Sequence, residues 1–139
     1  MKELVTALIM WLSAGYDLPA TSDHPTIRYE SPATMTSIRY DGGTAGHARV
    51  VALYDGRIDT IYLSEGWDRR DPVDISVLVH ELVHHLQQKA GLQYACPQAR
   101  EALAYEAQAR WLAMFGRTLE EEFQTNPLAL KLRTSCMAP

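Results

Sequence analysis

Residues 80–85 read HELVHH, which places three histidines and a glutamate inside a run of valines and leucines. On a helix, His80 and His84 project from one face, one turn apart. Two imidazoles at this spacing can both direct a nitrogen toward one ion about 2 Å away. Glu81 lies on the flank of that face, about 60° round from His84 at 100° per residue. This is the HExxH arrangement, in which two histidines bind a metal and the glutamate is a general base.

The surroundings of this motif favour a metal site over a proton shuttle or an accidental cluster. Buried imidazoles and a buried carboxylate each need a partner, and a single ion supplies one for all of them. The sequence therefore predicts a zinc site. The apolar neighbours that bury the motif are Val77, Leu78, Val79, Leu82, Val83 and Leu86.

Capping residues and helix breakers predict the helices. The metal helix follows Asp71-Pro72 and ends at Gly91, and the next helix begins at Pro97 and ends at Gly116. Residues 1–14 are either an amphipathic helix of the fold or a signal peptide, and Glu3 favours the helix because a signal peptide carries basic residues there. Shorter helices are expected over residues 32–38 after Ser31-Pro32, after the capping box that begins at Thr118, and over residues 128–132 after Asn126-Pro127.

A small antiparallel sheet is expected before the metal helix. Residues 47–54 and 57–63 are rich in β-branched and aromatic side chains, and Asp55-Gly56 between them predicts a hairpin turn. Residues 25–30 are a further strand candidate. The order of helix, small sheet and then helices is typical of an α+β domain.

Length and charge restrict the class of protein. A chain of 139 residues with 47% apolar residues fits one domain, residues 1–139, with a hydrophobic core. The net charge is −4 and no dense basic patch occurs, so no nucleic-acid partner is expected. No apolar run approaches the roughly 18 residues of a membrane span. Cys96 and Cys136 either form a disulfide, which would favour an exported protein over a cytoplasmic one, or are two buried thiols.

A catalytic zinc needs a third protein ligand, and the next helix offers Glu101 and Glu106. Both lie near the level of the histidine pair when rise is counted from the turn. On a helical wheel, Glu101 lies within the apolar stripe. Glu106 is about 140° away beside Arg110, with which an exposed ion pair is expected. The sequence therefore favours Glu101, with Glu106 in reserve. The stripe around Glu101 consists of Tyr105, Trp111, Leu112 and Phe115.

The segments SVLVHELVHHLQ and EALAYEAQARWL resemble the small HExxH metallopeptidases of the gluzincin type, in particular the ImmA/IrrE-like minimal domains and an uncharacterised bacterial family of the same plan. The resemblance covers residues 48–112. It implies a motif E-x-E-A-(D/N)-x-x-A whose first glutamate, the third ligand, falls on Glu101. Leu103 and Tyr105 depart from that motif, which puts the groups that support the ligands in doubt. The resemblance also implies that an extended peptide lies along the sheet edge, with residues 57–63 lining the cleft.

The expected reaction is hydrolysis of a peptide bond by a metal-activated water with Glu81 as general base. A second donor is needed for the developing oxyanion, and the candidates are Tyr62, His85, Tyr94 and Tyr105. Tyr105 and His85 could instead support the ligands, Tyr105 could be a core residue, and His85 could lie on the surface. The remaining histidines, His24 and His47, are expected to be structural or exposed. A domain this small has few cleft walls, so a protein partner could complete the substrate site.

Three classes of function remain open at this point. The first is a zinc metallopeptidase. The second is a zinc-bound regulatory or protein-binding module without hydrolytic activity. Glu81 argues against this class, because such a module does not need a general base. The third is a closed structural site made of His80, His84, Cys96 and Cys136, which a disulfide between the cysteines would exclude.

Overall fold

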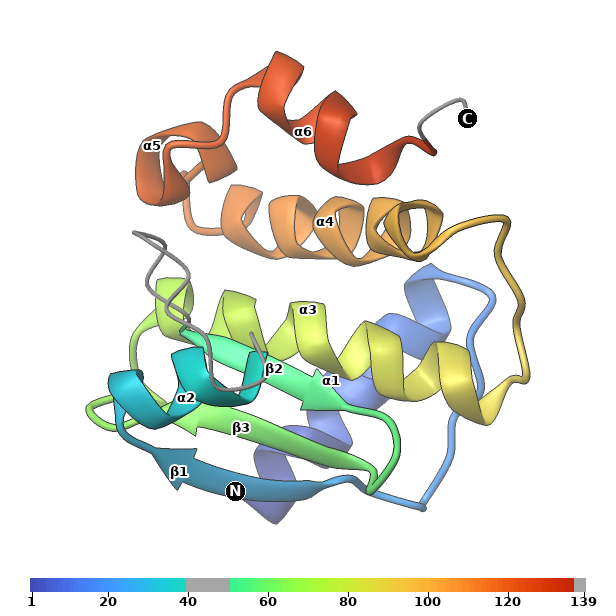
Figure 1. The fold of residues 1–139 in the computed structure, drawn as a ribbon. Helices are drawn as coiled ribbons and strands as arrows, with labels where there is room; N and C mark the ends of the chain where they lie inside the picture. Colours follow the sequence, from blue (N-terminus) through green and yellow to red (C-terminus); the bar gives the residue numbers. More distant parts are fainter. Residues whose placement is uncertain (40–50, 137–139) are drawn as a thin grey trace.

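The computed structural model describes residues 1–39 and 51–136, and these residues adopt the α+β fold that the sequence predicts. A small sheet packs against the helix that carries residues 80–85, and the C-terminal helices are stacked on the other side of that helix (Figure 1). In chain order the elements are α1 (Lys2–Gly15), β1 (Thr26–Glu30), α2 (Pro32–Arg39), β2 (Ala52–Asp55), β3 (Thr60–Ser64), α3 (Pro72–Lys89), α4 (Pro97–Ala113), α5 (Leu119–Phe123) and α6 (Pro127–Thr134).

The sheet is mixed, which corrects the prediction of a purely antiparallel sheet. Its strand order is β1-β3-β2, with β2 antiparallel and β1 parallel to β3. The local hairpin signal identified the antiparallel pair correctly. The direction of β1 depends on a connection through α2 and β2, and no local pattern encodes it. Because β3 lies in the centre, its edges are both paired, and β2 provides the edge beside α3.

The hairpin loop is longer than predicted. Asp55 pairs with Thr60, so the loop is Gly56–Asp59 rather than a two-residue Asp55-Gly56 turn. The Asp55 carboxylate accepts hydrogen bonds from Arg57, and Asp59 takes the left-handed conformation with φ of 49°. Aspartate tolerates that conformation better than most residues, so it can close the loop where a glycine was expected. Of the predicted strand 47–54, residues 47–50 lie outside the described part of the chain.

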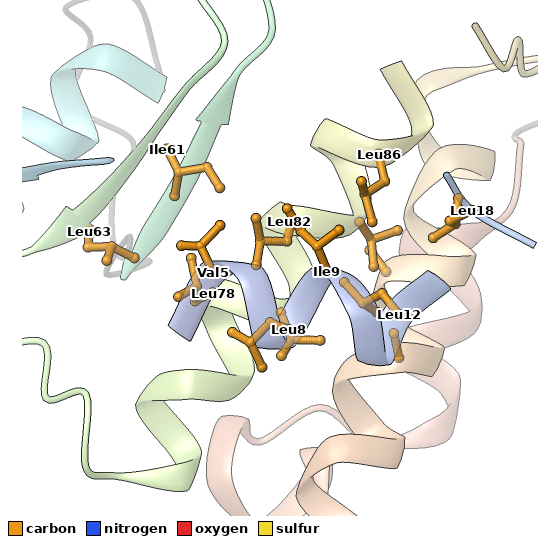
Figure 2. Close-up of a cluster of buried hydrophobic side chains, with 14 residues drawn as sticks. Val5, Leu8, Ile9, Leu12, Leu18, Ile61, Leu63, Leu78, Leu82 and Leu86 are labelled. Carbon is orange, nitrogen blue, oxygen red and sulfur yellow. The ribbon is translucent and has the colours of Figure 1, made fainter. Parts of the chain in front are cut away.

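The N-terminal segment is a helix of the fold, as the amphipathic pattern predicts. Its apolar stripe packs against α3 and the inner face of the sheet (Figure 2). The stripe consists of Val5, Leu8, Ile9 and Leu12, and its partners include Ile61, Leu63, Leu78, Leu82 and Leu86. This core fixes α3 against both α1 and the sheet. Over the ranges 1–39 and 51–136, no helix combines the length and the apolar character that crossing a membrane requires.

The predicted caps position the helices that carry the site. The Asp71 carboxylate accepts a hydrogen bond from the Val73 amide at the start of α3, where Pro72 occupies the first helical position. Gly91 follows the end of α3 with a positive φ of 67°. Pro97 begins α4, which then packs against α3 over its length. The other predicted caps, Ser31 and Thr118, each accept the expected backbone hydrogen bond. Asn126, expected only to end the preceding helix, also caps α6 by accepting a hydrogen bond from the Ala129 amide.

Candidate metal centre

Two buried imidazoles and one carboxylate meet between α3 and α4. His80 and His84 are 7% and 6% exposed, and their rings lie one helical turn apart on the face of α3 that meets α4. The His84 Nε2 atom lies 2.6 Å from Glu101 Oε2, and the His80 Nε2 atom lies 3.5 Å from Glu101 Oε1. The candidate ligand atoms of the three residues all fall within 4.8 Å of one another, so this group could hold a metal ion.

Glu106, the reserve ligand, does not join this group. Its side chain is exposed and lines a pocket on another face of α4. The ion pair expected between Glu106 and Arg110 is not formed. Arg110 instead stacks on the rings of Trp11 and Tyr16, with its guanidinium carbon 5.8 and 5.7 Å from their centroids. The helical wheel therefore selected the glutamate that lies beside the two histidines, but it did not predict that Arg110 would pack against Trp11 and Tyr16.

A buried glutamine fixes the orientation of the His84 ring. The Gln87 amide nitrogen lies 3.0 Å from the Arg100 carbonyl oxygen, which can only accept a hydrogen bond. The Gln87 Oε1 atom therefore faces His84 Nδ1, at 2.9 Å, and the nitrogen must donate to it. In the neutral ring, the lone pair is then on Nε2 and points toward Glu101.

A second buried glutamine, Gln108, fixes the orientation of the His80 ring. The Ser76 hydroxyl donates to the Val73 carbonyl oxygen, so it accepts from the Gln108 amide nitrogen at 3.3 Å. The Gln108 Oε1 atom then accepts a hydrogen bond from His80 Nδ1 at 2.9 Å. Outer-shell partners of this kind usually fix the tautomer and orientation of metal-binding histidines. Sequence reasoning missed both glutamines, although Gln108 falls beside Glu101 on the wheel and Gln87 follows His84 by three residues.

The resulting arrangement needs a positive charge at its centre. Two nitrogen lone pairs face a carboxylate, and the buried Glu101 Oε2 atom has no hydrogen-bond partner. The short contact to His84 does not have hydrogen-bond geometry, so proximity alone does not satisfy this oxygen. A divalent cation bound by both nitrogens and the carboxylate would satisfy all three groups. The donor set of two histidines and one glutamate is also a familiar one for catalytic zinc.

The pKa shifts of Glu101 and His80 agree with the need for a positive charge at this site. Burial alone would raise the pKa of Glu101, but the two imidazoles hold that pKa well below its usual range. Burial alone would lower the pKa of His80, but the Glu101 and Glu81 carboxylates raise it above 6.5. Each shift favours the charged form of its group, which shows that the site stabilises opposite charges side by side. A bound cation would take the place of the imidazole protons.

Glu81 lies beside the three-residue group without belonging to it. Its Oε1 atom accepts a hydrogen bond of 3.0 Å from the Tyr54 amide on strand β2. Its Oε2 atom lies 4.0 Å from His80 Nε2. The side chain is 13% exposed. One carboxylate oxygen is thus fixed by the sheet edge, and the other is directed toward the ligands, as expected for a base that acts next to a metal.

His85 lies away from the metal group and is fully buried, which excludes a surface position. Its Nδ1 atom contacts the Asp59 carboxylate at 2.6 Å, and its Nε2 atom contacts the Asp23 carbonyl oxygen at 2.7 Å. The Tyr54 hydroxyl and the Lys89 ammonium also contact Asp59. Burial would raise the pKa of Asp59, but these hydrogen bonds and charges lower it. His85 therefore has no free donor for an oxyanion and instead ties α3 to the hairpin.

The three tyrosine candidates occupy different environments. Tyr62 is buried under α2 with Met35, on the sheet face opposite the main core. The Tyr94 hydroxyl accepts a hydrogen bond from Gln87, which supports His84. Tyr105 packs edge-on against the His80 ring, with 4.6 Å between ring centroids. Tyr105 thus contacts a candidate ligand directly, and its side chain is half-buried.

The two cysteines form a disulfide, which settles the alternative that the sequence left open. Because their sulfur atoms are bonded to each other, they cannot complete a closed site with His80 and His84. The bond joins Cys96, the residue before α4, to Cys136, just after α6. His24, expected to be structural or exposed, is half-buried with its Nε2 atom 3.4 Å from the Thr6 hydroxyl, and His47 lies outside the described residues.

Gln87 gives a direct test of the orientation argument. The variant Gln87→Ala should lower zinc affinity roughly 10- to 100-fold, because His84 then loses the acceptor that fixes its tautomer. Gln88→Ala is the matched control, since Gln88 contacts the hairpin at Gly56 and not the histidines. Affinity is measured by competition with a chromophoric chelator. Equal affinities for the two variants would contradict the orienting role.

The fold and the site together define a small α+β domain whose two central helices present a His-His-Glu group able to hold a metal ion. The chain belongs to the family described as Domain of unknown function (DUF6647), whose model matches residues 1–139. No curated protein and no solved structure matches the chain.

Proposed function

We propose that this protein is a zinc-dependent metallopeptidase. The observation that carries the proposal is the convergence of two oriented imidazoles and the Glu101 carboxylate, with the Glu81 carboxylate beside them and outside the ligand set. His80, His84 and Glu101 would hold the zinc. Zinc, when bound, supplies Lewis-acid chemistry that makes water acidic enough to lose a proton near neutral pH.

Glu81 is the general base in this proposal. Its Oε1 atom is held by the Tyr54 amide, so its Oε2 atom is the one free to accept a proton from the attacking water. The same oxygen then returns the proton to the leaving amine. A purely binding or structural zinc site has no use for this carboxylate, and its placement therefore favours the peptidase over a zinc-bound regulatory or protein-binding module.

Strand β2 is the proposed site of peptide binding. In the described part of the sheet it is an edge strand, and its Tyr54 amide already reaches the catalytic base. An extended peptide can add to such an edge through main-chain hydrogen bonds, which would hold the cleaved bond near Glu81. The disulfide favours an exported location, because disulfides persist in oxidising compartments.

Metal analysis beside a cleavage screen tests the proposal. The purified protein should bind one equivalent of zinc and should cleave sites in a diverse peptide mixture, as read by mass spectrometry. Removal of zinc with a chelator should abolish cleavage, and addition of zinc should restore it. Zinc binding without cleavage of any peptide would favour the binding module, and a protein that does not bind zinc would contradict both readings.

A further inference from the structure

A pocket next to the metal group has no role in the chemistry described so far. Helix α6 runs beside α4 on the side away from α3 (Figure 1). Between α4 and α6 lies a cavity of about 270 Å³. Its lining residues are Ala102, Tyr105, Glu106 and Ala109 from α4, and Leu130 and Thr134 from α6.

Tyr105 connects this pocket to the candidate metal centre. Tyr105 lines the pocket, and its ring packs against the His80 ring, with 4.6 Å between centroids. Burial raises the pKa of Tyr105, and the Glu101 and Glu81 carboxylates add to the rise, while Arg133 of α6 opposes it. One side chain therefore contacts both the pocket and a residue of the candidate metal group.

The lining suits one apolar side chain. Two alanines, a leucine and a tyrosine ring supply most of the walls, and the exposed Glu106 lies at the rim. The volume is below the roughly 300–1,000 Å³ typical of pockets that enclose a whole small-molecule ligand. The pocket therefore fits an aliphatic or aromatic side chain better than a complete ligand.

The outer wall of the pocket is a surface helix that packs on α4. No residue of α6 is fully buried. Arg133 of α6 donates to the Thr125 hydroxyl at 3.1 Å and also interacts with the Tyr105 phenol on α4. The Cys96–Cys136 disulfide joins the end of α6 to the start of α4. The disulfide is thus one of the links that hold this wall in place.

We propose that the pocket between α4 and α6 is a specificity subsite that takes an aliphatic or aromatic side chain from a residue flanking the cleaved bond. The inference rests on the proposed peptidase function and names its substrate class as peptides with a large apolar residue at that position. The disulfide-tethered α6 is one wall of this subsite.

Filling the pocket tests this inference. The variant Ala109→Leu places a larger side chain in the cavity. Alanine and leucine both favour helices, so the substitution should leave α4 intact. It should lower kcat/KM for peptides with leucine or phenylalanine at the subsite about 10- to 100-fold. Peptides with glycine there should be cleaved as by wild type, with unchanged zinc content. Ala113→Leu is the matched control, because Ala113 is exposed on the same helix and does not line the pocket.

Two further variants change the outer wall instead. Leu130→Ala widens the pocket from α6 and should shift preference from leucine toward larger aromatic residues. The double variant Cys96→Ser with Cys136→Ser releases α6 and should weaken the preference for apolar residues while zinc remains bound. An equal loss for glycine and leucine peptides in Ala109→Leu, or no loss for either, would overturn the proposal.

A binding measurement separates this inference from the peptidase proposal. Peptide hydroxamates, which chelate zinc, are titrated calorimetrically into zinc-loaded protein, with leucine or glycine as the residue next to the chelating group. Wild type should bind the leucine compound more tightly, and Ala109→Leu should remove the difference. A difference without any peptide cleavage would support the subsite and contradict the peptidase. Cleavage with equal binding of both compounds would support the peptidase and overturn the subsite, and neither cleavage nor a difference would overturn both.

Discussion

The variant Glu81→Gln should lose peptide hydrolysis by roughly 10²- to 10⁴-fold in kcat/KM, the usual contribution of a general base, while it keeps its zinc. Glutamine has the same shape, and its amide oxygen can still accept the hydrogen bond from the Tyr54 amide. The amide cannot accept a proton from water at neutral pH, so only the proton transfer is removed. Zinc affinity should be unchanged, because Glu81 is not among the candidate ligands.

The measurement combines zinc content with the cleavage rate of a peptide that wild type cuts. Glu120→Gln is the control for loss of one negative charge, because Glu120 is exposed on α5 and is not one of the groups around the metal site. This control should behave as wild type in both measurements. An active Glu81→Gln enzyme would contradict the assignment of the base, and loss of zinc from that variant would show that Glu81 is a ligand.

The candidate site could be predicted largely because its residues lie on two well-marked helices. Helix period and capping signals fix which face each side chain occupies, and this is sufficient to predict from the sequence that His80, His84 and Glu101 lie together. The prediction needed only local geometry and the assumption that two consecutive helices pack against each other.

The groups that support the site were not predictable in this way. Gln108 contacts His80 across 28 residues of sequence, and Asp59 contacts His85 across 26. The wheel places Gln108 on the same face as Glu101, but it does not tell which side chain Gln108 contacts, and Asp59 in the hairpin loop has no local signal at all. Their roles depend on which face of a neighbouring element reaches α3, and tertiary packing alone determines that.

In the sheet too, contacts between neighbouring segments could be predicted from the sequence, and contacts between distant segments could not. The strand character of residues 26–30 follows from composition, and the antiparallel pairing of β2 with β3 follows from the hairpin. The parallel pairing of β1 with β3 joins segments that are far apart in sequence. Consequently residues 57–63 are expected from the sequence to line the peptide cleft, whereas β3 lies in the centre of the sheet and β2 is the edge strand that contacts Glu81.

The variant Glu101→Ala should lose zinc, with an affinity lower than wild type by more than the roughly 10- to 100-fold that loss of an outer-shell partner costs. It removes one of three ligands and the only carboxylate in the group. The two imidazoles keep their orientation, because Gln87 and Gln108 do not depend on Glu101. Weakened binding would therefore report the missing ligand and not a disordered site.

Glu106→Ala is the matched control for this variant. It makes the same substitution on the same helix five residues further on, at an exposed position outside the ligand group. The readout is thermal unfolding with and without zinc, since a metal that binds only the folded state stabilises it by about 4 kcal/mol at 1,000 times its dissociation constant. Zinc should raise the unfolding temperature of wild type and Glu106→Ala but not that of Glu101→Ala. The reverse result would assign the third ligand to Glu106, and a zinc response in all three proteins would mean that the histidines bind the metal without either glutamate.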